Sequence, residues 1–297
     1  MKFSITPFYL ICILLLLISC NENQKNKTSV IKNFKTKSYL EIKLDSFGHL
    51  PSNPYIIKFE KKEKSITFCG VEHLTDNSDV TNKMFQDIEK SFLKTNPSIA
   101  INEGGYVDGK KYASKREAIL KDGEIGLLKY LSDSLKIKTV NGDPEIDYEL
   151  KELSKLYSKK EFLTYIITER LLWSLYDNKV TNYDSIVSNY TKFLDNYIIK
   201  QGKLSLSPNE KTFDYFKKNY QELVGRPFEI NSLKPTNPFD KNGKFQEIGR
   251  KSKEIRDQFL LQKTNELLKT NNRVYIVFGG WHLLTCEPGM HQIINQY

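Results

Sequence analysis

The chain has 297 residues, of which 39% are hydrophobic and 27% are charged, and its formal net charge at pH 7 is +9. Its lysines and arginines are scattered along the sequence and form no block of the kind that binds nucleic acid, so we expect no nucleic-acid partner. The length suits one large domain, or one domain with an insertion.

The first twenty residues resemble the signal of a bacterial lipoprotein. Lys2 precedes an apolar run over residues 8–18, which is shorter than the ~20 apolar residues of a membrane-spanning helix. Residues 17–20 (Leu-Ile-Ser-Cys) match the lipobox at which lipoprotein signals are cleaved. We predict that residues 1–19 are a signal peptide and that Cys20 carries the lipid, such as palmitate. A single N-terminal membrane anchor is the alternative, and either one places the domain outside the cytoplasm, facing the periplasm or at the cell surface.

Residues 20–37 are rich in asparagine, lysine and threonine, a composition that is typical of a flexible tether without a core. We therefore predict that the folded domain spans residues 38–297. Within this domain, residues from about 149 to 244 are expected to form a helical insertion.

Apolar patterns predict alternating strands and helices in the first half of the domain. Short strands are expected at residues 39–44, 55–59, 65–69, 98–101 and 138–140, and helices at residues 79–93 and 115–135. Strands that alternate with helices indicate a mainly parallel sheet, with ligand-binding groups at the carboxyl ends of its strands. The predicted fold class is therefore α/β, with a mixed, mainly parallel sheet flanked by helices.

The second half is predicted to be helical until near its end. The insertion contains a capping box at residues 207–210 (Ser-Pro-Asn-Glu) and a set of aromatic residues that we assign to a core. Residues 226–243 are a loop rich in proline and asparagine, which we expect to be a lid or rim. A long helix over about residues 245–269 then precedes a last strand at residues 273–278.

Two of the four histidines follow predicted strands in the same local context. His73 ends the sequence Gly-Val-Glu-His at residues 70–73, and His282 ends Gly-Gly-Trp-His at residues 279–282. A glycine at a strand end permits a sharp turn, so both imidazoles could share one crevice above the sheet as base, acid or metal ligand. His49 and His291 are interpreted as structural.

Carboxylates accompany these two histidines. Glu103 directly follows a predicted strand, and Glu72 precedes His73. His73, Glu103 and His282 would suit a divalent metal such as zinc, manganese or cobalt, with open positions for water. They would equally suit an acid–base pair that activates water without a metal. Asp143 and Glu145 also follow a strand, and we interpret them as a plain acidic turn.

Two cysteines remain in the mature chain besides Cys20. Cys69 lies four residues before His73, and Cys286 lies four residues after His282. An exported protein meets oxidising conditions, so a disulfide between them and a pair of buried free thiols are both open at this point.

Taken in order, these motifs resemble those of the TraB/GumN/Tiki superfamily, which includes ChaN-type haem-binding lipoproteins and erythromycin-esterase-like hydrolases. The matching residues are Gly-Val-Glu-His at 70–73, Pro-Ser-Ile-Ala-Ile-Asn-Glu at 97–103, Arg256-Asp257, and Val-Phe-Gly-Gly-Trp-His-Leu at 277–283. The resemblance covers residues 39–105 and 245–297, about half of the mature chain. Trp281 departs from the family, which commonly has a small residue there, and is expected to narrow or shield the pocket.

The resemblance implies roles for the site residues. His73 and His282 would be metal ligands or catalytic bases, with Glu103 and Glu72 as carboxylate partners. Arg256 would stabilise an anion or oxyanion.

We therefore expect a hydrolase, metal-assisted, in which activated water attacks an amide or ester carbonyl of a peptide or ester substrate. The motifs H-E-x-x-H and G-x-S-x-G are both absent, so the sequence gives no support for a zincin or a serine hydrolase. The alternative is a lipoprotein that binds haem or a metal without catalysis.

Overall fold

The structure is a computed structural model that describes residues 33–43, 49–74, 76–104, 107–233, 236 and 238–297. The predicted signal peptide, the lipidation site Cys20 and most of the predicted tether lie outside these residues. Across the described ranges, every helix is too short or too polar to span a bilayer.

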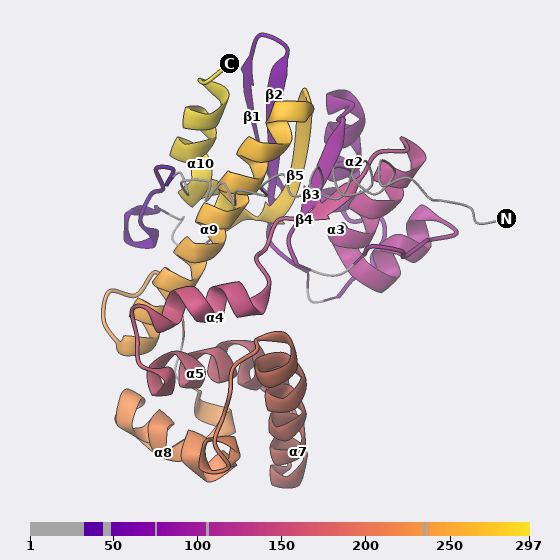
Figure 1. Cartoon of the computed structure of the whole chain (residues 1–297). Coiled ribbons are helices and arrows are strands. Elements are labelled where there is room, and N and C mark those ends of the chain that lie inside the picture. Colours follow the sequence, from indigo (N-terminus) through magenta and orange to yellow (C-terminus); the bar gives the residue numbers. More distant parts are fainter. Residues whose placement is uncertain (1–32, 44–48, 75, 105–106, 234–235, 237) are drawn as a thin grey trace, which may run out of the picture. The chain divides into compact units, whose positions relative to one another are not determined.

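The described residues form an α/β fold around a mixed five-stranded sheet (Figure 1), which confirms the predicted fold class. The strand order is β1-β2-β5-β3-β4, and β1 pairs antiparallel with β2 while the other pairs are parallel. The strands are β1 (Tyr55–Lys61), β2 (Lys64–Val71), β3 (Ile99–Asn102), β4 (Thr139–Asn141) and β5 (Arg273–Gly279).

The register of the three central strands places their carboxyl ends together. Val71, the last residue of β2, pairs with Gly279, the last residue of β5. Asn102, the last residue of β3, pairs with Val277. Because the strands are parallel, the residues that follow them emerge at one edge of the sheet.

Helices cover both faces of the sheet, as Figure 1 shows. Helices α2 (Lys83–Thr95) and α3 (Lys115–Ser134) pack on one face, and α9 (Lys244–Thr270) and α10 (Gly280–Ile294) pack on the other. Side chains alternate between the faces along β5, where Tyr275 and Val277 contact the first layer and Ile276 and Phe278 contact the second. Each layer therefore has its own apolar core.

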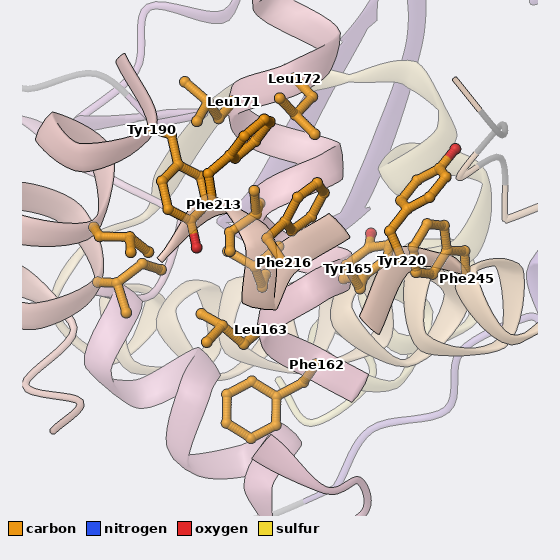
Figure 2. Packing of buried hydrophobic residues seen from close by; sticks show 14 of the residues in the cluster. Phe162, Leu163, Tyr165, Leu171, Leu172, Tyr190, Phe213, Phe216, Tyr220 and Phe245 are labelled. Atoms are coloured by element: carbon orange, nitrogen blue, oxygen red, sulfur yellow. The ribbon is translucent and has the colours of Figure 1, made fainter. Parts of the chain in front are cut away.

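The predicted helical insertion is present, with an aromatic core of its own (Figure 2). Of the six predicted core aromatics, Tyr190, Phe213, Phe216 and Tyr220 are buried there, whereas Phe193 and Tyr197 are only partly buried. Two of its segments, η2 (Thr168–Leu172) and η3 (Leu194–Gln201), are π-helices. The elements are α4 (Ile146–Ser154), α5 (Lys159–Ile167), η2 (Thr168–Leu172), α6 (Trp173–Asp177), α7 (Tyr183–Phe193), η3 (Leu194–Gln201), η4 (Asn209–Lys211), α8 (Phe213–Val224) and η5 (Ile230–Ser232).

One local prediction is wrong, and another is confirmed in a shorter element. The segment at residues 39–44 is not a strand where it is described, because Ser38 caps a single 3-10 turn, η1 (Tyr39–Glu41), and Tyr39 is buried. The capping box at residues 207–210 forms its hydrogen bonds, but it begins only the single turn η4, and Thr212 caps the following helix α8.

The predicted tether ends earlier than residue 37. Phe34 is buried, and its backbone N–H and carbonyl both bond the side chain of Gln258 on α9. The backbone N–H of Lys37 donates to the carbonyl of Thr285 on α10 at 2.9 Å. Residues 33–37 are therefore part of the folded body and are fixed against the last two helices.

Candidate active site

The two predicted histidines and Glu103 meet at the carboxyl edge of the sheet. His73 lies two residues beyond β2, Glu103 directly follows β3, and His282 lies in the first turn of α10. The Nε2 atom of His73 is 3.3 Å from Oε2 of Glu103, and the Nε2 atom of His282 is 3.8 Å from Oε1 of the same carboxylate. The structure therefore brings together the three side chains that the sequence singled out.

Glycines at the strand ends allow this close approach. A Cβ atom on Gly70 would lie only 2.9 Å from the backbone Cα of Gly280, so a larger residue would push β2 and α10 apart. A Cβ atom on Gly279 would lie 3.0 Å from Glu103 Oε2 and 3.4 Å from His73 Nε2. The space above Gly279 is thus a cradle enclosed by the candidate catalytic atoms.

This geometry makes Gly279→Ala a specific test of the site. Gly279 has φ −52° and ψ 134°, a conformation that alanine also adopts, so the substitution adds a methyl group without backbone strain. We expect the methyl group to displace Glu103 and His73 and to lower any activity of the site by about 10²-fold, since small misplacements of reacting groups have such effects. The measurement is kcat/KM together with a thermal melt. Full activity in a folded variant would contradict this view of the cradle.

His282 is fixed by a buried carboxylate on its other ring nitrogen. Its Nδ1 atom lies 2.5 Å from Oδ1 of Asp257, which is fully buried in α9. Oδ2 of Asp257 accepts hydrogen bonds from Thr285 at 2.9 Å and from Tyr39 at 3.3 Å. Because Asp257 is an acceptor in this network, we assign the proton of His282 to Nδ1, which leaves the Nε2 lone pair directed toward Glu103.

His73 has the same arrangement with a different partner. Its Nδ1 atom lies 2.7 Å from Oε1 of Glu124, a buried carboxylate of α3. Burial alone would lower the pKa of His73, but hydrogen bonds to Glu103 and Glu124 outweigh it and raise the pKa to about 10. His73 is therefore protonated at neutral pH.

Glu103 is held as a carboxylate at the centre of the site. Its Oε1 atom accepts a hydrogen bond from Arg256 at 2.6 Å, and its Oε2 atom accepts one from the backbone N–H of Gly279. Burial would raise the pKa of Glu103, but Arg256 and the two histidines outweigh it and hold the pKa well below its usual value. Arg256 also bonds Asp143 at 2.7 and 3.0 Å, so this guanidinium joins two carboxylates.

These groups line a cavity of about 460 Å³. Trp281 lines the same cavity and packs edge-on against Phe239, with ring centroids 4.6 Å apart. Phe239 belongs to the predicted lid loop and also contacts Tyr39. Aromatic side chains therefore border the crevice next to His282, in line with the shielding expected of Trp281.

No family model, curated protein or solved structure matches this chain. The resemblance to the TraB/GumN/Tiki superfamily thus stays a prediction, supported by the four motifs alone.

Other predicted residues have different positions. Glu72 lies at the rim of the cavity, where its carboxylate accepts the backbone N–H of Leu50 at 2.8 Å and lies 3.4 Å from His49 Nδ1. Asp143, which we interpreted as part of a plain acidic turn, is instead an ion-pair partner of Arg256.

Of the two alternatives left open for Cys69 and Cys286, the buried free thiols are confirmed and the disulfide is wrong. Both thiols are free and buried. Cys69 points into the core between the sheet and helices α2 and α3, whereas Cys286 belongs to the core on the opposite face, beneath α9 and α10. The sheet therefore lies between the two sulfur atoms.

Sequence reasoning missed three partners of the histidines. Asp257 belongs to the Arg-Asp motif, and this motif is the sequence signal for its role. Glu124 follows a kink in α3 at Asp122 and Gly123, and the Asp-Gly pair in a helical pattern was its only sequence signal. Tyr39 carried no signal, because its contact with Asp257 joins the two ends of the domain.

One feature of the site agrees with a metal centre and two do not. Both histidines are bonded through Nδ1 to carboxylates, as metal-ligating histidines commonly are. However, both carboxylate oxygens of Glu103 already accept hydrogen bonds, one from Arg256 and one from the backbone N–H of Gly279. Among the residues that the structure describes, no group of three or more His, Cys, Asp or Glu side chains is placed to hold a metal ion.

Proposed function

We propose that this chain is a hydrolase of amide or ester bonds that works outside the cytoplasm, attached to a membrane through a lipid on Cys20. One observation supports the hydrolase most directly: two imidazoles face one carboxylate through Nε2, while each is fixed through Nδ1 by a carboxylate of its own. The compartment and the anchor rest on the sequence of the first twenty residues.

The two histidines would have opposite roles in this reaction. A water molecule beside His282 would lose a proton to Nε2 as its oxygen bonds to the carbonyl carbon, and Asp257 would stabilise the imidazolium that forms. The bond to the amine or alcohol would then break, and His73 would supply the proton that the leaving group needs. Such a pair, in which different surroundings separate an acid from a base, is a recurring design of hydrolytic sites.

Arg256 acts on Glu103 in this proposal. Its Nε and Nη2 atoms are bonded to carboxylates, so the guanidinium positions Glu103 between the histidines. Glu103 in turn stabilises the positive charge on His73. This is a more limited role than the oxyanion stabiliser that the resemblance implies.

The divalent metal stays a prediction, and no step of the reaction is derived through it. A bound ion would polarise the carbonyl and lower the pKa of water. Metal binding at His73 would release the proton that it shares with Glu103, so any affinity should increase with pH. Haem binding also stays a prediction, with a Soret band on titration as its signature.

The experiment compares wild-type protein with His282→Ala and with His291→Ala on panels of fluorogenic esters and peptide amides. His291 lies on the same helix, outside the site, and serves as the matched control. We expect His282→Ala to lose about 10³-fold in kcat and His291→Ala to retain full activity. Absence of turnover on both panels, or equal losses in the two variants, would contradict the proposal.

Metal analysis of the same samples separates the two forms of water activation. Activity that survives a chelator would support direct activation by His282. A stoichiometric metal that is lost in both His73→Ala and His282→Ala would show that Glu103 moves from Arg256 to the ion, and would replace the direct route with the metal-assisted one.

A further inference from the structure

A second cavity, of about 390 Å³, adjoins the histidine site. Its volume lies within the range of small-molecule pockets, about 300–1,000 Å³. Lys253 and Arg256 line both cavities, so a ligand that extends past these two side chains would reach from one cavity into the other. The far wall comes from the helical insertion, for which the reaction proposed above has no use.

Both π-helices contribute to this wall. Glu169 and Arg170 lie on η2, and Tyr197 and Gln201 lie on η3, and all four line the second cavity. A π-helical turn fits the helical ladder poorly and is found frequently at functional sites. The insertion thus departs from regular α-helix at two of the places where it faces the cavity.

A buried hydroxyl in the cavity lacks a partner. Tyr165 is fully buried and lines the cavity, and its hydroxyl has no hydrogen-bond partner among the described residues. Its ring is fixed by the core of the insertion, where it packs against Phe245 with ring centroids 6.3 Å apart (Figure 2). A ligand group placed beside this hydroxyl would supply the hydrogen bond that it lacks.

The charged groups of the lining are paired with one another. Arg170 bonds the buried carboxylate of Glu149, which also accepts the Ser252 hydroxyl at 2.6 Å. Lys253 lies 3.2 Å from Glu169, and Arg256 holds Asp143. The lining thus contains three cations and three carboxylates, so no net charge is left to attract an ion.

We infer that this cavity binds an uncharged, hydroxyl-rich group, a sugar unit, of a substrate whose scissile bond lies at the histidines. Sugar hydroxyls both donate and accept hydrogen bonds. The paired carboxylates and cations, the amides of Asn141 and Gln201 and the unpartnered Tyr165 hydroxyl provide matching acceptors and donors. The inference of a sugar site rests on the cavity alone. Only the statement that the sugar belongs to a hydrolysed substrate rests on the proposed function.

The test begins with binding of the purified protein to an array that carries neutral hexose and N-acetylhexosamine oligomers, acidic glycans and peptides. We expect retention on neutral glycans. The best neutral glycan is then titrated against wild type, Tyr165→Phe and Tyr183→Phe, where Tyr183 is an exposed tyrosine of the insertion and serves as the matched control. We expect roughly tenfold weaker binding for Tyr165→Phe alone, from the loss of one hydrogen bond.

A thermal melt without glycan separates binding from folding. Tyr165→Phe should be at least as stable as wild type, because it removes a hydroxyl that is unbonded in the free protein. The inference is overturned if the array retains only peptides or acidic glycans, if it retains nothing, or if Tyr165→Phe binds as tightly as wild type.

His282→Ala keeps this inference distinct from the proposed function. We expect the variant to bind the neutral glycan with unchanged affinity while it loses hydrolysis. Glycan binding without turnover by wild type would contradict the hydrolase and support the sugar site. Turnover that is the same in wild type and Tyr165→Phe, with no glycan bound, would contradict the sugar site alone.

Discussion

Asp257→Asn is expected to lower kcat by about 10³- to 10⁴-fold while the fold is retained. An asparagine amide has nearly the same shape, but its NH₂ group cannot accept the Nδ1–H of His282, so the imidazole would take the other tautomer and present a protonated Nε2 to the substrate. The measurement is kcat on the best substrate of the panels, with circular dichroism to verify folding.

The matched control for this variant is Asp133→Asn, at an exposed carboxylate near the end of α3 that pairs with Lys129. It should retain wild-type kcat. If Asp257→Asn is also fully active, the view of His282 as a base oriented by Asp257 is contradicted. If Asp257→Asn unfolds, Thr285→Val tests the same carboxylate, since it removes one hydrogen bond to Asp257 and leaves the charge in place.

Arg256→Ala is expected to lower the free energy of unfolding by about 3 kcal/mol at pH 7, as measured by urea denaturation. The side chain is only 16% exposed, and its removal leaves the largely buried carboxylate of Asp143 without a cation and that of Glu103 with His73 alone. The exposed Arg116 provides the control, and Arg116→Ala should stay within about 0.5 kcal/mol of wild type.

The stability that Arg256→Ala loses should be smaller at low pH. Arg256 lowers the pKa of Glu103, so its contribution to stability is present above the unfolded pKa of glutamate, about 4.3, and disappears as the pH falls further. The difference between wild type and variant should therefore narrow below about pH 5. A difference that stays constant from pH 7 to pH 4 would contradict the ion-pair explanation.

The sheet and the two histidines could be predicted because their signals are local. The strands ending at Val71, Asn102 and Gly279 are short apolar runs, and parallel pairing then fixes that their ends meet. The structure also explains the glycines before His73 and His282. A Cβ at Gly70 would crowd the backbone of Gly280, and a Cβ at Gly279 would crowd the carboxylate of Glu103.

The carboxylates that orient the histidines were harder to predict because they depend on tertiary contacts. Glu124 and Asp257 lie within helices α3 and α9, where a charged residue normally faces solvent. Apart from the Arg-Asp motif at Asp257 and the Asp-Gly pair before Glu124, nothing in the local sequence distinguishes them from the many other acidic residues of helices. Their burial follows only from how each helix packs against the sheet.

The disulfide alternative for the two cysteines is wrong for a reason of geometry. Cys69 and Cys286 are each four residues from a site histidine, which suggested that they are close to one another. Cys69 lies on a strand, where side chains alternate between faces, and Cys286 lies on a helix that covers a single face. The two cysteines are thus equally far in sequence from a site histidine but lie on opposite sides of the sheet.

If Cys20 carries the proposed lipid, the attachment of residues 33–37 to α9 and α10 would limit the distance between the cavity and the membrane. If Cys20 carries the lipid, thirteen residue steps separate the bilayer surface from Asn33, and a fully extended chain of that length spans at most about 45 Å. The next anchored residues lead directly to Tyr39, at the wall of the cavity. The cavity would then stay close to the lipid surface. Soluble substrates would have to diffuse to this region to be hydrolysed.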